Sequence, residues 1–389
     1  MKIVVSAGGR FHAHRLAQQL LQRDALQQLY TFDHNPTDRS SLPAAYVSVH
    51  EPCKIADKLF VRLHLGRVWN KTHFNRLKDN VFDAYVSKEL TKQRAPDIFV
   101  GWANYAEKSL FVARQRGTKL IIIESGSCHI SVQEALIKQE YDRWGLRTPP
   151  ICEKTKSKML REYEAADYIM TPSPFVQNSF LETGFPSEKI LCVPYGADTS
   201  FFTPAPNPPE VFTALFVGLI SLQKGIPYLL EAWRRAALPT NQARLVLVGN
   251  MQQDFLAIRT RLPITSNVHF RGGVRPEVLK TYYQQASIFV MPSIQEGLTM
   301  AVGEAIASGL PVIASTHTGW EGRIIPGVSG SLYNPYDVDH LADLLRWHFL
   351  HYEKAQQLAA TARQQLGAHT WDAYGQQVYG AYQRIMNHE

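Results

Sequence analysis

The chain contains 389 residues, 45% of them hydrophobic and 19% charged, and its formal net charge at pH 7 is +7. This length allows two or three domains that each bury a core, and the absence of low-complexity tracts excludes a disordered or fibrous protein. Its four cysteines are far apart and form no Cys-x-x-Cys pair, so the sequence gives no signal of a metal or redox site and favours a reduced, cytoplasmic protein.

The amino-terminal stretch is predicted to be a strand and not a targeting signal. Its apolar run, residues 2–6, meets Gly8 and Gly9 almost at once, which is too short for a signal-peptide core. No apolar run approaches the ~20 residues of a membrane span. We therefore expect a cytoplasmic protein that is soluble or peripheral at the inner face of a membrane. The positive charge favours anionic partners, and no nucleic-acid-binding motif accompanies it.

The first half of the chain alternates predicted strands with predicted helices. The expected strands are residues 2–6, 29–32, 96–100, 119–123, 167–173 and 189–193, and the expected helices include 11–23 and 175–183. Gly8 and Gly9 form the turn between the first strand and the first helix, where backbone amides can approach a ligand. The spacing is not Gly-x-Gly-x-x-Gly, so it is weak as a dinucleotide motif.

Residues 54–94 combine basic and aromatic side chains. Leu59 and Leu63 fall on one face of a predicted helix, and a basic amphipathic helix can lie on an anionic bilayer. The commoner explanation of such a charge run is the solvated face of an ordinary helix, and both interpretations stay open. The basic residues include Lys58, Arg62, Arg67, Lys71, Arg76 and Lys78.

A polar loop follows the core strand 119–123 and runs from Glu124 to His129. Polar groups at the end of a central parallel strand are candidates for a binding site. His129 could contact a substrate or shuttle a proton, although a lone histidine is more often structural.

Four prolines within residues 203–209 mark the expected end of the first domain. The alternation of strands and helices then starts again. Strands are expected at 215–218, 245–249, 268–273, 288–291 and 312–314, and helices at 226–237, 277–286, 299–308 and 371–386. The sequence therefore predicts an α/β protein of two doubly wound, Rossmann-like domains facing each other across a cleft, with domains at 1–203 and 204–370.

Lys224 lies in a glycine-rich loop after the first strand of the second domain, behind Gly218. Lysine binds phosphate as a mobile point charge, so Lys224 is a candidate phosphate contact. A surface lysine in a turn is the alternative.

Residues 287–315 read as a strand, a loop, a helix and a second strand. The first-turn amides of this helix, including those of Leu298, Thr299 and Met300, are expected to point outward at the carboxyl end of a parallel sheet. Such amides can hold phosphate without a basic side chain. Glu296 in the loop and Glu304 in the helix would flank that phosphate with acceptors, which suits the hydroxyls of a sugar and a ribose. This combination describes a nucleotide sugar.

Two glutamates separated by seven residues, in the setting P-S-x-x-E-G…E-A-x-A-S-G-x-P-V-I, resemble the retaining glycosyltransferases of family four, which have the GT-B fold. The resemblance implies an acceptor-binding first domain, a donor-binding second domain and a final helix, residues 371–389, that crosses back to the first. It implies that Glu304 binds the ribose, Glu296 and Gly297 the donor sugar, and the loop of Gly272 and Val274 the base.

No Asp-x-Asp cluster lies in a suitable loop, so we expect a metal-independent enzyme without a cofactor beyond its donor. Glu296, Lys224 and His129 are its candidate catalytic residues. Two arginines that are usual in the family are replaced, by Ser125 and by Leu219. Arg10 or Arg271 could supply the missing cation.

The predicted activity is transfer of a sugar from a UDP- or GDP-linked donor to a lipid-linked or saccharide acceptor in surface polysaccharide or glycolipid synthesis. Two alternatives stay open at this point: a nucleotide-sugar epimerase of the same architecture, and a non-catalytic nucleotide-sugar-binding protein. Release of nucleoside diphosphate would distinguish the transferase from both.

Overall fold

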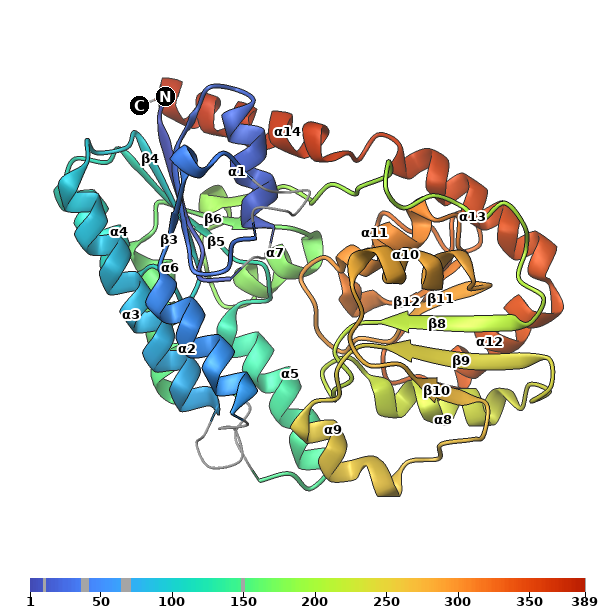
Figure 1. Ribbon diagram of the computed structural model, residues 1–389. Coiled ribbons are helices and arrows are strands. Elements are labelled where there is room, and N and C mark those ends of the chain that lie inside the picture. Colours follow the sequence, from blue (N-terminus) through green and yellow to red (C-terminus); the bar gives the residue numbers. More distant parts are fainter. Residues whose placement is uncertain (10–11, 36–41, 64–70, 148–150, 389) are drawn as a thin grey trace.

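Two parallel β-sheets, each covered by helices on both faces, form the protein (Figure 1). The computed structural model describes residues 1–9, 12–35, 42–63, 71–147 and 151–388. All pairings between the named strands are parallel. The predicted fold class, two doubly wound α/β domains, is therefore confirmed.

The first sheet has the strand order β3-β2-β1-β4-β5-β6-β7. Its strands are β1 (Ile3–Ser6), β2 (Leu26–Thr31), β3 (Val47–Val49), β4 (Ile98–Trp102), β5 (Leu120–Glu124), β6 (Tyr168–Thr171) and β7 (Ile190–Cys192). Its helices are α1 (Ala13–Leu21), α2 (Glu51–Arg62), α3 (Lys71–Lys92), α4 (Glu107–Gln115), α5 (Ile130–Arg143), α6 (Glu153–Ala165) and α7 (Pro174–Leu181). The central strands β1, β4 and β5 are buried along their whole length, which explains why they appear in the sequence as continuous apolar runs.

The second sheet has the strand order β10-β9-β8-β11-β12-β13. Its strands are β8 (Phe212–Val217), β9 (Ala243–Val248), β10 (Val268–Phe270), β11 (Ile288–Met291), β12 (Val312–Ser315) and β13 (Ser331–Tyr333). Its helices are α8 (Ile226–Ala236), α9 (Gln253–Ile258), α10 (Pro276–Gln284), α11 (Met300–Ala307), α12 (Val338–Leu350) and α13 (Tyr352–Leu366). The strand order reverses between β8 and β11, and ligands of doubly wound sheets bind at the carboxyl ends of strands at such a point.

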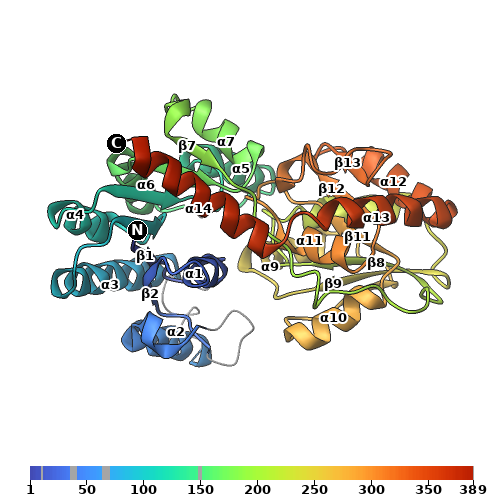
Figure 2. The same cartoon turned by 90° about the horizontal axis from the view of Figure 1, so that it is seen from above.

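The last helix, α14 (Trp371–His388), returns to the first sheet and packs on α1 (Figure 2). Arg23 at the end of α1 donates a 2.8 Å hydrogen bond to Asp372 at the start of α14. The chain thus crosses between the sheets twice, and the two crossings touch, because Ala197 pairs with Thr370 in a short parallel bridge. These crossings form the hinge between the two domains.

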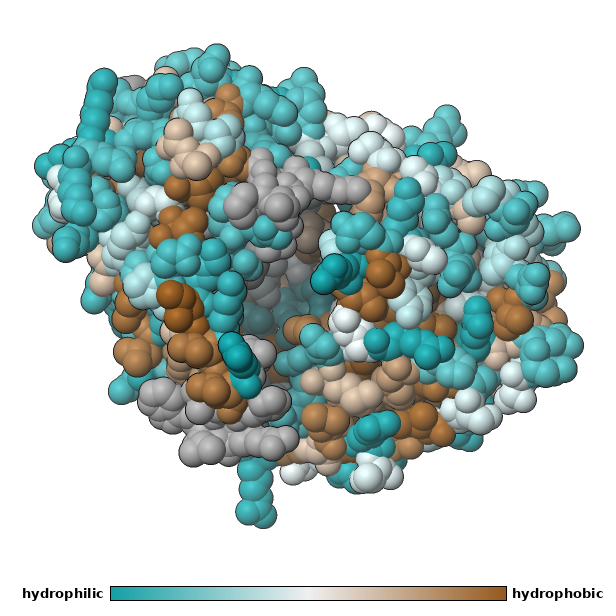
Figure 3. Space-filling model, in the orientation of Figure 1, coloured by the Kyte–Doolittle hydropathy of each residue, from teal (hydrophilic) through white to brown (hydrophobic). Residues whose placement is uncertain are grey.

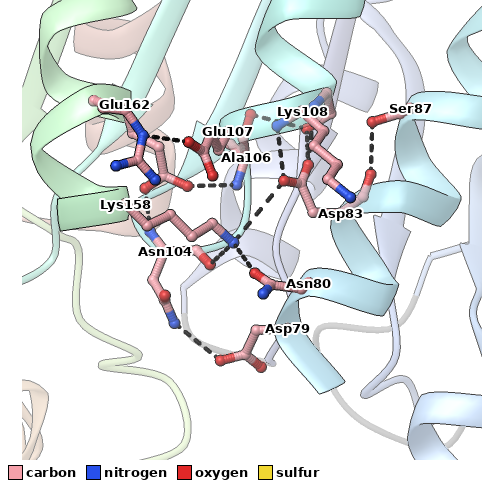
Figure 4. A network of polar contacts seen from close by, with 12 residues as sticks. Asp79, Asn80, Asp83, Ser87, Asn104, Ala106, Glu107, Lys108, Lys158 and Glu162 are labelled. Carbon is pink, nitrogen blue, oxygen red and sulfur yellow. Dashed lines mark hydrogen bonds and ion pairs between the residues drawn. The ribbon is translucent and has the colours of Figure 1, made fainter. Parts of the chain in front are cut away.

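A buried polar network fixes the loop that follows β4, at the carboxyl edge of the first sheet (Figure 4). Glu162 accepts hydrogen bonds from the backbone amides of Asn104 (2.5 Å) and Ala106 (2.9 Å). The Lys158 ammonium donates to the Asn104 carbonyl (2.8 Å) and lies 3.9 Å from the Asp83 carboxylate. Burial raises the pKa of Glu162 to about 7. The network holds this loop, and Asn104 keeps a left-handed conformation with φ of 75° within it.

Candidate active site

The candidate site lies at the point where the strand order of the second sheet reverses. The loop after β8 and the loop after β11 meet there, because Gly225 packs on the carbonyl of Pro292. Gly225 has φ of 66°, and a Cβ atom at this position would collide with that carbonyl. Glycine is therefore required on two counts, conformation and space. Its neighbour Lys224 is held against the loop that carries Glu296.

Lys224 and Glu296 form an ion pair, with side chains 19% and 14% exposed. Ser293 donates a 3.1 Å hydrogen bond to the same Glu296 oxygen that faces Lys224. Sequence patterns identified both residues separately, 72 positions apart, and the structure brings them into direct contact. A cation and an acceptor side by side can divide a ligand between them, with phosphate on Lys224 and hydroxyl groups on Glu296.

The head of α11 differs in part from the prediction. The amide of Thr299 does not point outward, because it donates a 3.1 Å hydrogen bond to the carbonyl of Thr318, so this part of the prediction was wrong. The Thr299 side chain donates to the same carbonyl at 3.2 Å. The amides of Leu298 and Met300 make no hydrogen bond to any part of the chain that the structure describes. These two amides stay available as donors to an anion.

Glu304 lies in the second turn of α11 and is partly exposed. One of its oxygens accepts a 2.8 Å hydrogen bond from the hydroxyl of Tyr283, which lies on α10. Burial raises the pKa of Glu304 to about 7, the Tyr283 hydrogen bond opposes this, and the charge of Asp198 in the hinge adds to it. Glu304 is therefore a carboxylate that lacks a cation, and its ionised form gains from any donor group that a ligand brings.

The loop of Glu296 also touches the first domain. Gln295 donates a 2.8 Å hydrogen bond to the hydroxyl of Ser127, in the polar loop after β5. The Ser173 hydroxyl donates to the carbonyl of Gly297 at 2.7 Å. A Cβ atom on Gly297 would collide with the backbone of Gly126, so only glycine permits this approach. The two domains are therefore in contact beside the Lys224–Glu296 pair.

His129, a predicted catalytic candidate, is held in place by contacts within the first domain. It is the N-cap of α5, and its Nδ1 accepts a 3.3 Å hydrogen bond from the amide of Ser131. The ring packs between Tyr163 and Phe180, with centroid distances of 5.2 and 5.1 Å, and burial lowers its pKa. His129 and Lys189 also line a pocket of about 330 Å³. Within the described structure, His129 contacts neither half of the Lys224–Glu296 pair.

The glycines predicted to approach a ligand lie at the carboxyl edges of the two sheets. Gly8 follows β1, and a side chain there would collide with the ring of Tyr105 in the loop after β4. Gly9 is adjacent to it, whereas Arg10 falls outside the described residues. Gly218 follows β8, and the stem of Lys224 passes over it.

The loop after β10 lies beside the loop after β9, since the Gly272 carbonyl accepts a 2.8 Å hydrogen bond from the amide of Gly249. Val274 is partly buried two residues further on. Arg271, the proposed substitute for the arginine missing at Leu219, lines a separate groove of about 480 Å³ with Arg244 and Glu277. Leu219 itself is 49% exposed.

Sequence patterns missed several residues that shape the site. The ring of His317 stacks on Phe175 of the first domain, with centroids 4.8 Å apart, and its Nδ1 lies 2.7 Å from the Ile294 carbonyl. Gln223 donates a 2.9 Å hydrogen bond to Gln295. Such contacts join residues from distant parts of the chain, and no local signal indicates them. Among the described residues, no cluster of three His, Cys, Asp or Glu side chains is placed to hold a metal ion.

Residues 199–365 match the family model described as Glycosyl transferases group 1. We refer to this part of the chain, which is similar to that family, as the group 1 domain. It contains Lys224, Glu296 and Glu304. The sulfoquinovosyl transferase SQD2 of Arabidopsis thaliana is 28% identical over 229 residues, which are 54% of this chain and 43% of the plant protein. The chain spans between a third and a half of the length of the first curated relatives that it matches.

Solved structures resemble the group 1 domain together with the domain before it. HepE from Anabaena, in complex with UDP and glucose, has a TM-score of 0.70 and 17% identity. The match covers 98% of this chain and 99% of the HepE chain. WaaG, a glycosyltransferase involved in lipopolysaccharide biosynthesis, has a TM-score of 0.69 and 18% identity, covering 97% and 98%. The two facing Rossmann-like domains are thus the GT-B fold. Within the described residues, no helix is both long and apolar enough to span a membrane.

Proposed function

We propose that the protein is a retaining glycosyltransferase that moves a sugar from a UDP- or GDP-linked donor to a saccharide or lipid-linked acceptor. The observation that carries this proposal is the contact between Lys224 and Glu296 beside the two open amides of α11, Leu298 and Met300. A cation, two backbone donors and a carboxylate at one point match a diphosphate joined to a hydroxyl-rich sugar.

Each residue has a role that follows from its contacts. Lys224 would leave the Glu296 carboxylate and contact the diphosphate, which adds to the charge stabilisation by the α11 amides. Glu296 would then accept hydrogen bonds from hydroxyls of the donor sugar. Glu304, whose Tyr283 contact leaves its other oxygen open, would accept from the ribose hydroxyls.

The proposed chemistry needs no protein nucleophile. The acceptor oxygen forms a bond to the anomeric carbon, the bond from that carbon to the phosphate oxygen breaks, and the acceptor proton passes to a phosphate oxygen on the same face. The described site holds Glu296 without a second carboxylate in contact with it, whereas a double-displacement mechanism would need a nucleophile and an acid. Positioning and charge stabilisation are the contributions left to Lys224, Glu296 and the amides.

The proposed setting is synthesis of a surface polysaccharide or glycolipid. It is supported by the similarity to SQD2, a sulfoquinovosyl transferase, to HepE, solved with UDP and glucose, and to WaaG, which is involved in lipopolysaccharide biosynthesis. The acceptor would enter beside the loop from Ser125 to His129, since that loop faces Gln295 and Gly297 across the domain contact.

Nucleoside diphosphate release tests this function. The protein is incubated with UDP- and GDP-sugars and with lipid or saccharide acceptors, and free UDP or GDP is measured. Lys224→Ala or Glu304→Ala should lower turnover at least ~100-fold, the usual loss for an electrostatic group at a transition state. Lys354→Ala, an exposed lysine on α13, is the matched control and should leave turnover unchanged. Unchanged kinetics in both site variants would refute the proposed function.

We also propose that α2 and α3 dock the protein on an anionic membrane, where a lipid-linked acceptor would lie. Figure 3 shows hydrophobic side chains gathered over these two helices. They repeat every four residues along each helix and are 45–58% exposed: Ile55, Leu59 and Leu63 on and just beyond α2, and Leu77 and Val81 on α3. The exposed Lys58 and Arg62 lie along the same stretch and complement acidic headgroups. Arg67, predicted in the same basic stretch, falls outside the described residues.

Vesicle sedimentation tests the membrane proposal. The wild-type protein should sediment with phosphatidylglycerol vesicles and not with phosphatidylcholine vesicles. Leu59→Glu should weaken this binding, because it places an unpaired charge at the apolar–polar boundary. Leu350→Glu, at a leucine that is 69% exposed on α12, is the control and should bind like the wild type. Equal loss in both variants, or no binding by the wild type, would contradict the proposal.

A further inference from the structure

A further contact between the domains lies at the carboxyl end of α5, away from the hinge and from the contact beside the Lys224–Glu296 pair. Glu140 on α5 is fully buried, and the single hydroxyl proton of Tyr228 on α8 is shared between its two oxygens, which lie 3.0 and 2.8 Å from the hydroxyl oxygen. A completely desolvated carboxylate at the boundary between two domains is costly unless its partners are in place. The first domain supplies the carboxylate, and the group 1 domain supplies the hydroxyl.

Arg143 completes this cluster. Its guanidinium lies 3.2 Å from the Glu140 carboxylate and also bonds to the Tyr228 hydroxyl. It stacks over the ring of Tyr336, 4.8 Å from the ring centroid. At the next residue, Arg261 of the second domain donates a 2.9 Å hydrogen bond to the carbonyl of Trp144. Charge, hydrogen bonding and ring stacking therefore all cross the domain boundary here.

The position of this cluster matters for the site. In Figure 1, α5 bridges the domains at the lower side of the molecule, and α14 and the two chain crossings lie at the upper side. The loops that carry Lys224 and Glu296 follow β8 and β11, at the carboxyl edge of the second sheet. Separation of the domains about the hinge requires the Tyr228–Glu140 hydrogen bond to break.

Tyr228 is also close to the site along the chain. Helix α8 begins at Ile226, directly after Lys224 and Gly225, and Tyr228 lies in its first turn. A contact that fixes this turn also fixes the loop that presents Lys224 to Glu296.

We propose that Glu140, Arg143 and Tyr228 form an interdomain latch that holds the domains together and positions Lys224 for the donor. The three are positioning residues, since none contacts the Lys224–Glu296 pair. The claim that the latch positions Lys224 for a donor rests on the proposed function. The claim that it holds the two domains together does not depend on that function.

Two kinds of measurement test the latch. Tyr228→Phe keeps the ring and removes the shared hydrogen bond to Glu140. Small-angle X-ray scattering without any nucleotide should then show a larger radius of gyration than for the wild type. The donor KM should rise on the order of tenfold while kcat at saturating donor stays unchanged. Loss of hydrogen bonding to a charged group is costly, so the arrangement with the domains held together becomes less populated. A donor that binds only this arrangement loses apparent affinity in proportion to its population.

Tyr333→Phe is the matched control. Its hydroxyl is buried in the same domain without a hydrogen-bond partner in the described structure, so scattering and donor KM should match the wild type. Glu140→Gln is the second variant, keeps an acceptor for Tyr228, and should shift both readouts in the same direction by less. A Tyr228→Phe variant that unfolds at lower temperature but retains wild-type scattering and donor KM would overturn the latch, because its role would then be structural only. Since the scattering needs no substrate, failure of the latch is distinguishable from failure of the transferase proposal.

Discussion

The substitution Glu304→Gln is expected to stabilise the fold and to weaken donor binding, so two effects of this one carboxylate can be measured separately. In the native protein, burial raises the pKa of Glu304 from 4.5 to about 7. Between these two values the native state binds more protons than the unfolded state, so the stability contributed by this group falls as the pH rises through that window. Above pH 7 the native carboxylate is ionised against an unfavourable environment. Glutamine cannot ionise and escapes this cost.

The expected gain is modest but measurable. The pKa difference corresponds to at most about 3 kcal/mol, and because the side chain is partly exposed we expect ~1–3 kcal/mol. The glutamine carbonyl can still accept the hydrogen bond from Tyr283. Glu304→Gln should therefore raise the free energy of unfolding at pH 8, and raise it much less at pH 5, near the lower end of the window. The variant should also bind donor at least ~10-fold more weakly, because a neutral acceptor forms weaker hydrogen bonds than a carboxylate.

Urea denaturation at pH 5 and pH 8 measures the first effect, and donor KM measures the second. Glu210→Gln, on the exposed linker between the sheets, is the control and should change neither quantity. If Glu304→Gln and Glu210→Gln have the same unfolding free energy at pH 8, the argument from burial is refuted. Equal stabilisation at both pH values would refute the assigned titration.

Two further substitutions, one at the domain contact beside the site and one in the buried network after β4, test the packing described above. Gly297→Ala should push its loop away from Gly126, lower the free energy of unfolding by ~1–3 kcal/mol and reduce turnover, because the added methyl group over-packs the contact. Gly380→Ala on α14, where a Cβ meets only ordinary contacts, is the control and should not be destabilising. Lys158→Met should destabilise the protein by ~3–5 kcal/mol at pH 8, since it leaves buried carboxylates without their cation. The loss should shrink at pH 5, below the pKa of about 7 of Glu162, and equal losses at the two pH values would contradict this account. Calorimetry and turnover assays measure these effects.

The fold is largely readable from the sequence wherever burial is complete. The strands β5, β11 and β12 appear as unbroken apolar runs because both faces of each are covered. The helix α11 is also predicted, since small apolar residues and Gly309 define its body and end. Strands β3 and β13, of three residues each, are not predicted.

No element is predicted above for residues 316–370, where the structure has β13, α12 and α13. For α12 the signal is present, because Leu341, Leu345 and His348 recur at helical spacing and are buried. For the site, the two glutamates and Lys224 were found from local patterns. Their ion pair, the engagement of the Thr299 amide and the capping role of His129 depend on which distant loops meet.

The latch shows the same limit more sharply. Glu140 and Tyr228 are 88 positions apart, and each alone resembles an ordinary helical residue. Only the packing of α5 against α8 makes one of them a fully desolvated carboxylate and the other its donor.

Titration calorimetry with UDP and GDP tests the central claim, that a nucleoside diphosphate binds between Lys224 and the head of α11. The wild type and Lys354→Met, the exposed control on α13, should bind one of the two nucleotides with equal affinity. Lys224→Met should bind that nucleotide at least ~10-fold more weakly, because a charge-assisted contact to phosphate is lost. Equal affinity of Lys224→Met and the wild type, or no binding of either nucleotide by any of the three proteins, would contradict the account.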